Sequence, residues 1–136
     1  MECTIASRPT GHDGLRFALM SAGLRMMDAA QEPGGFPQAH DEVVRFCATE
    51  LLPHLGHDDR WLVEVADCPE GRLLVEAMRA EVRMMKAAVN ELSTATEPAE
   101  AMAQVRVLHA FLAAHDHHEA LLRNAAAHVG APAARH

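Results

Sequence analysis

Aromatic and β-branched residues are scarce in this chain. Aromatic side chains make up only 4% of the 136 residues, with one tryptophan and no tyrosine. β-branched residues are also sparse beside alanine, leucine and methionine. Because aromatic and β-branched residues favour strands, whereas alanine, leucine and methionine favour helices, the composition argues against an all-β fold. It favours packed helices, and the length suits one domain.

The chain also lacks a basic cluster, a long apolar run and paired cysteines. Its net charge of −7 argues against nucleic acid or an anionic membrane as a partner. No apolar run approaches the roughly 18 residues that span a membrane, and the first residues lack the basic and apolar stretches of a secretory signal. The cysteines Cys3, Cys47 and Cys68 lie far apart, so we expect reduced thiols and a cytoplasmic protein.

Four amphipathic segments separated by short breaks make up most of the chain. The spacing of their apolar residues predicts helices over about 11–30, 38–66, 70–92 and 99–128. Pro53 lies inside the second segment and should kink that helix. Met26, Met84 and Met85 are expected in a methionine-rich core.

The connections between the predicted helices are short, which makes neighbouring helices antiparallel. The sequence therefore predicts an all-α fold, an up-down-up-down antiparallel four-helix bundle, over residues 11–129. Residues 1–10 are expected to form a flexible arm, and residues 130–136 a disordered tail.

Ten histidines are the unusual feature of the composition, and two predicted helices carry them in the same pattern. His54 is followed four residues later by Asp58, and His115 by Glu119. Residues at this spacing lie one turn apart on one face, here the face that also carries the apolar residues. A buried carboxylate without a partner is very costly. A metal cation would partner both carboxylates at once, and a buried histidine–aspartate ion pair is the alternative.

His12, at the start of the first predicted helix, is a fifth candidate ligand. It lies on the same face as Leu15 and Leu19. Imidazole and carboxylate ligands suit iron, manganese or zinc, and no cysteine falls in this pattern. The sequence thus predicts a metal site in the core of the bundle.

With these residues the sequence resembles the hemerythrin-like, or HHE cation-binding, family. The matching stretches cover nearly the whole chain in the family's order: HDGLRFAL, FCATELLPHLGHDDRWL, MRAEVRMMKAAVNEL and LHAFLAAHDHHEALL. The resemblance implies a four-helix bundle around a non-haem di-iron site. It implies the ligands His12, His54, Asp58, His115 and Glu119, with Asp58 in place of the usual glutamate.

The third predicted helix departs from the family pattern. Val82 stands where the family often has a ligand histidine, and Lys86 stands where true hemerythrins have another. By the family's geometry one metal keeps its histidines, whereas the other keeps only His115 and the shared carboxylates. Either the second metal is lost or another residue supplies a ligand. The candidates by helical phase are Glu81, His118 and Glu50.

A site with few histidines and open positions favours activation of O₂ or peroxide over oxygen carriage. We therefore expect a metal-dependent oxidoreductase that oxidises a small molecule. A di-iron centre is the expected cofactor, with a single metal, manganese or zinc as alternatives. The first alternative function is a non-catalytic module that binds, senses or stores O₂ or iron. The second is a metal-free helical bundle that acts through protein contacts.

Further residues lie near the predicted ligands in the sequence. His57 and His117 are candidates for residues that hold the ligands or relay protons, and Asp116 is expected at the surface or beside a ligand. The sequence leaves open whether the chain forms a homodimer.

Overall fold

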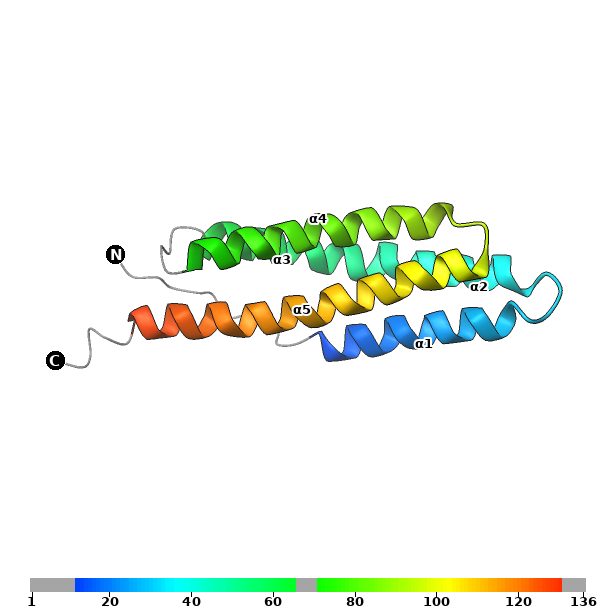
Figure 1. Ribbon diagram of the computed structural model, residues 1–136, viewed down its shortest axis with the longest axis horizontal. Helices are drawn as coiled ribbons and strands as arrows, with labels where there is room; N and C mark the ends of the chain where they lie inside the picture. The colour runs from blue at the N-terminus through cyan, green and yellow to red at the C-terminus, as the bar shows by residue number, and fades with distance from the viewer. Residues whose placement is uncertain (1–11, 66–70, 131–136) are drawn as a thin grey trace.

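The structure is a computed structural model that describes residues 12–65 and 71–130, with side chains over 12–63 and 71–124. Its elements in chain order are α1 (Asp13–Ala29), α2 (Gly35–Phe46), the π-helical η1 (Cys47–Leu51), α3 (Leu52–Val65), α4 (Arg72–Thr94) and α5 (Pro98–Gly130). The helices lie side by side along the long axis of the molecule (Figure 1). The prediction of an all-helical bundle is confirmed for these residues. The predicted arm, and the predicted tail beyond Gly130, lie outside them.

The turn between α1 and α2 depends on two adjacent glycines. Gly34 has a φ of 75°, in the left-handed region that residues with a Cβ rarely adopt. A Cβ on Gly35 would lie 2.0 Å from the carbonyl oxygen of Ala29, so no larger residue fits there. The turn is therefore tighter than the sequence suggested, because the second helical segment begins at Gly35 and not near Gln38.

The second helical segment is interrupted before Pro53 and not at it. The backbone N–H of Leu52 donates to the carbonyl of Cys47, which makes η1 one turn of π-helix. The hydroxyl of Thr49 donates to the carbonyl of Arg45 at 2.9 Å. A proline has no N–H and crowds the carbonyl four residues earlier. One π turn thus lies directly ahead of the proline at which the sequence predicts a kink.

Two apolar clusters fill the bundle. The large apolar cluster includes Leu19, Met26, Val43, Cys47, Leu51, Leu55, Val82, Met85, Leu92, Leu108 and Leu112. The small apolar cluster consists of Trp61, Leu62, Val75, Met78 and Leu122. Met84 is 54% exposed, so the prediction that it lies in the core is wrong. Its neighbour Met85 is buried, and consecutive residues of a helix point to different sides.

A layer of polar side chains lies between the two clusters. This polar layer consists of His12, His54, Asp58, Glu81, His115 and Glu119, all of them buried except the half-buried His54. On α5 the apolar Leu112 precedes the layer and Leu122 follows it. α1 begins beside the middle of α5 (Figure 1), which places His12 at the level of this layer. No helix within the described ranges is long and apolar enough to cross a membrane.

Candidate metal centre

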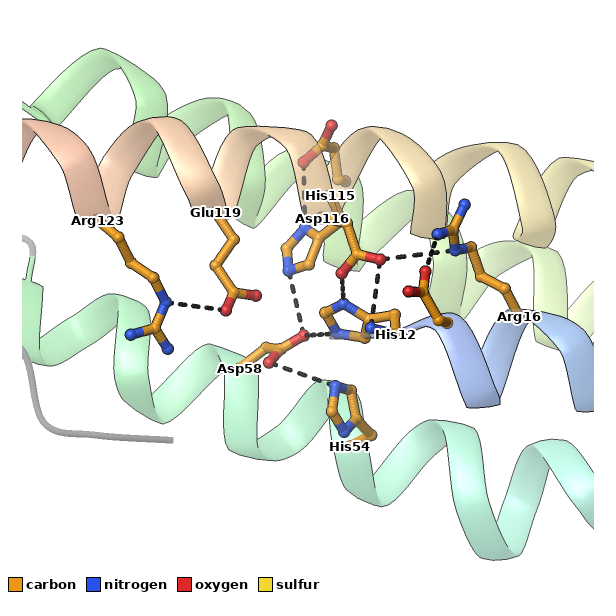
Figure 2. Close-up of polar contacts among 10 residues, drawn as sticks. His12, Arg16, His54, Asp58, His115, Asp116, Glu119 and Arg123 are labelled. Atoms are coloured by element: carbon orange, nitrogen blue, oxygen red, sulfur yellow. Dashed lines mark hydrogen bonds and ion pairs between the residues drawn. The ribbon is translucent and has the colours of Figure 1, made fainter. Parts of the chain in front are cut away.

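Three histidines from three parts of the chain face the carboxylate of Asp58. The Nε2 atoms of His12 and His115 lie 3.4 and 3.1 Å from its Oδ2. The Nε2 atom of His54 lies 3.7 Å from its Oδ1. Figure 2 shows the imidazoles pointing toward this carboxylate from α5, from α3 and from the start of α1. Asp58 is only 1% exposed, so this convergence takes place inside the protein.

Local structure places these donors. His12 is the N-cap of α1, and its carbonyl accepts the first helical hydrogen bond from the N–H of Arg16 at 2.7 Å. His54 and Asp58 lie one turn apart on α3, on the face toward the core. The rings of His12 and His54 pack edge to face, with centroids 4.3 Å apart. This packing fixes the direction of both imidazoles.

The spacing of the donor atoms is compatible with a metal ion. His12, His54 and Asp58 offer one ligand atom each within 4.8 Å of one another. A second group, His12 with Asp116 and Glu119, meets the same criterion. Both groups contain buried side chains, and both include His12. The described residues therefore contain buried histidine and carboxylate groups that can hold a metal ion.

Two further carboxylates contact His12 and His115 at Nδ1, the ring nitrogen that does not face Asp58. Asp116 contacts Nδ1 of His12 and accepts its backbone N–H at 3.2 Å. Glu81 lies 3.1 Å from Nδ1 of His115 through Oε1. In both histidines Nδ1 is engaged, and Nε2 is the atom that faces Asp58. Carboxylates in this position orient metal-binding histidines and raise their basicity.

Glu81, predicted as a candidate for an additional ligand, contacts two histidines. Its Oε1 lies beside His115, and its Oε2 lies 2.7 Å from Nδ1 of His118. Burial lowers the pKa of His115, but the hydrogen bonds and negative charges of Asp58 and Glu81 raise it by more, so the net shift is upward. Because a metal ion competes with protons for an imidazole, this upward shift of the pKa makes metal binding by His115 weaker as the pH falls.

The remaining predicted residues lie outside the polar layer. Glu50 is exposed on η1, and His57 is exposed on α3 beside Arg60, so neither reaches the polar layer. His117 is exposed on α5. On α4, Val82 is buried in the large apolar cluster and Lys86 pairs with Asp59 at 3.1 Å. Glu81 is thus the residue through which α4 enters the polar layer.

Asp116 was expected at the surface or beside a ligand, whereas the arginines beside it were not predicted to belong to the site. A surface cleft of about 410 Å³ adjoins the polar layer and is lined by Asp13, Arg16, Asp116, His117, Glu119, Ala120 and Arg123. Nε of Arg123 donates to Glu119 at 3.1 Å, and Nε of Arg16 lies 3.5 Å from Asp116. The four-residue spacing of Glu119 and Arg123 could have predicted their ion pair from the sequence. The pair of Arg16 with Asp116 joins α1 to α5, and a single sequence gives no indication of such a contact.

No protein-family model matches this chain, and no curated protein or solved structure matches it either. Imidazole and carboxylate are the ligands that first-row metals such as iron, manganese and zinc accept. The polar layer offers both kinds in a water-poor setting.

Proposed function

We propose that the chain is a hemerythrin-like protein that binds iron in its polar layer and uses O₂ or peroxide to oxidise a small molecule. The observation that carries this proposal is the convergence of three Nε2 atoms, from His12, His54 and His115, on the buried carboxylate of Asp58. The up-down-up-down topology of the family is part of the proposal. The order of the helices and the short turn at Gly34 are compatible with it.

The cost of burying the polar layer supports a binding role. Removing charged groups from water is expensive, and well-packed apolar residues in the same place are often as stabilising or more so. In this chain the layer interrupts what would otherwise be one continuous apolar core. A cation bound among the imidazoles and carboxylates would offset the repulsion among the buried negative charges.

The donors favour a single iron in the centre of the layer. His12, His54, Asp58 and His115 would hold it, and Glu119 lies in the neighbouring group that shares His12. The second iron of the family would need an imidazole from α4, where this chain has Val82. We therefore propose one iron in place of the di-iron centre expected from the sequence, with manganese or zinc as the alternative metals.

Iron held by these residues would supply the redox chemistry for reduction of O₂ or peroxide. The chain contributes the surroundings of the iron. Asp116 and Glu81 hold the imidazoles of His12 and His115 so that their Nε2 atoms face inward. The two apolar clusters exclude water above and below the layer. The cleft beside Glu119 gives a small molecule access from solvent.

Metal analysis tests this proposal. We expect the full chain, expressed with iron, to contain about one iron per molecule, and His54→Gln and His115→Gln to lose most of it. His57→Gln is the matched control, because this histidine is exposed and lies one turn from His54 on the same helix. Circular dichroism checks that each variant folds. A wild-type chain without metal, or ligand variants that keep it, would overturn the proposal.

Turnover separates the enzyme from the oxygen-binding alternative. We expect the iron-loaded protein to consume O₂ or peroxide when a reducing small molecule is present, and to return to its starting absorption spectrum as the molecule is oxidised. A stable oxygen complex that releases O₂ unchanged on degassing would indicate carriage and would contradict the oxidase proposal.

A further inference from the structure

The cleft between α1 and α5 has the size of a small-molecule site. Its volume is about 410 Å³, and small-molecule sites measure roughly 300–1,000 Å³. Two of its lining residues, Asp116 and Glu119, belong to the candidate metal group that includes His12. A molecule in the cleft would therefore lie directly beside the polar layer. Figure 2 shows Arg123 and Arg16 on either side of Glu119 and Asp116.

Arg123 is held in place from two directions. Its Nε donates to Oε1 of Glu119 at 3.1 Å, and the centre of its guanidinium lies 5.2 Å from the centroid of the Trp61 ring. These contacts fix the plane of the guanidinium before any ligand arrives. Its Nη2 atom is shielded from solvent and has no hydrogen-bond acceptor among the described residues. Arg123 lines the cleft, so a ligand oxygen that enters the wall of the cleft beside this N–H and accepts from it would be favoured, because a buried N–H without an acceptor is costly.

The charges that line the cleft define the class of ligand. Arg16 pairs with Asp13 and Asp116, and Arg123 pairs with Glu119, so the two arginines are already largely neutralised. A group with two negative charges, such as phosphate, would be repelled by Asp116 and Glu119. A singly charged carboxylate is repelled less and matches the planar fork of an arginine.

We infer that this cleft binds a small molecule through a carboxylate group that accepts a hydrogen bond from Arg123. The rest of the molecule would then lie against the edge of the polar layer at Glu119. That this molecule is the one oxidised rests on the proposed function, whereas its binding depends on the cleft and can be measured separately.

Fluorine NMR with two matched probes tests the inference on the full chain, incubated with and without Zn²⁺. The probes are 4-fluorobenzoate and its neutral analogue 4-fluorobenzamide, which have nearly the same shape. We expect the benzoate to bind and the benzamide to bind at least about tenfold more weakly, as expected for the loss of a charge-assisted hydrogen bond. Equal binding of the two probes, or tighter binding of inorganic phosphate in competition, would overturn the inference.

Variants of the arginine assign the binding to one residue. Arg123→Gln should weaken benzoate binding about 10- to 100-fold, whereas Arg106→Gln, an exposed arginine of the same helix outside the cleft, should leave it unchanged. Arg123→Lys keeps a positive charge beside Glu119 without the planar fork, and we expect binding about tenfold weaker than wild type. Unchanged binding in both Arg123 variants would overturn the inference.

Metal content, measured on each protein, distinguishes this inference from the proposed function. A chain that takes up no metal but binds benzoate through Arg123 would refute the proposed function and support the cleft. A chain that keeps its metal in every variant but binds no benzoate would refute the cleft alone. If Arg123→Gln also loses its metal, benzoate binding by Arg123→Lys decides the test: binding as tight as in the wild type would overturn the inference, and binding about tenfold weaker would support it.

Discussion

The large apolar cluster and the polar layer both lie inside the bundle, yet they differ in what they contribute. The same helices supply both: α3 provides Leu55 and, one turn later, Asp58, and α5 provides Leu112 and then His115. Burial of a leucine stabilises the fold by roughly 1.5–3 kcal/mol, whereas burial of a charged group costs free energy unless it is paired. The bundle thus combines a region whose burial stabilises the fold with a region whose burial prepares a binding site.

Replacement of Asp58 by alanine should have the largest effect on the polar layer. Three imidazoles face this carboxylate, so Asp58→Ala removes the group common to all of them. We expect metal affinity, measured by competition with a chelator, to fall by more than the roughly 10- to 100-fold typical of a residue that only orients a ligand. Asp59→Ala is the control, because the adjacent Asp59 pairs with Lys86 at the surface. Wild-type affinity in Asp58→Ala would contradict this interpretation of the layer.

The matching change in the large apolar cluster is Leu112→Ala. Leu112 is fully buried, and its truncation should lower the free energy of unfolding by about 2–5 kcal/mol in urea denaturation. The folded variant should bind metal as the wild type does, because Leu112 contributes packing and no donor atom. Leu73→Ala, at a leucine that is 82% exposed, should change stability by less than about 0.5 kcal/mol. A selective loss of metal binding in Leu112→Ala would show that the two regions are not separable.

Glu81→Gln should have a smaller effect than the loss of a ligand. The amide oxygen can still accept from Nδ1 of His115, but it lacks the negative charge that raises the basicity of the imidazole. We expect metal affinity to fall about tenfold, at the lower end of the range for residues that orient a ligand. Glu76→Gln, at an exposed position of the same helix, is the control. A loss as large as that of Asp58→Ala would instead identify Glu81 as a direct ligand.

The smallest effect is expected at Cys47, within the large apolar cluster. Burial raises the pKa of its thiol from 9.0 to about 12, so the thiol stays protonated and unreactive near neutral pH. In a variant with Cys3 and Cys68 replaced by serine, a disulfide reagent should label Cys47 only as fast as the protein unfolds. The neutral thiol stabilises the fold below pH 9.0, and this contribution declines as the pH rises toward about 12. Rapid labelling of the folded protein would show that the apolar cluster is open to solvent.

The helices and the two histidine–carboxylate pairs were accessible from the sequence because both are local features. The period of apolar residues predicted the helices within a few residues, apart from the start at Gly35. The spacing of His54 and Asp58 predicted their common face, because residues four apart on a helix lie one turn apart. Pro53 predicted a kink, whereas no residue pattern in the sequence marked the π turn that precedes it.

The sequence by itself thus determined an all-helical chain and the helical faces that carry its donors. Tertiary structure alone decided which donors meet. Asp116 contacts a histidine 104 positions away, and Glu81 reaches His115 across the interface between α4 and α5. Such contacts depend on the rotation of each helix about its axis and on where α1 begins along α5, and these are set by packing between helices. The periodicity of one segment predicts neither the rotation of a helix about its axis nor the position of α1 along α5.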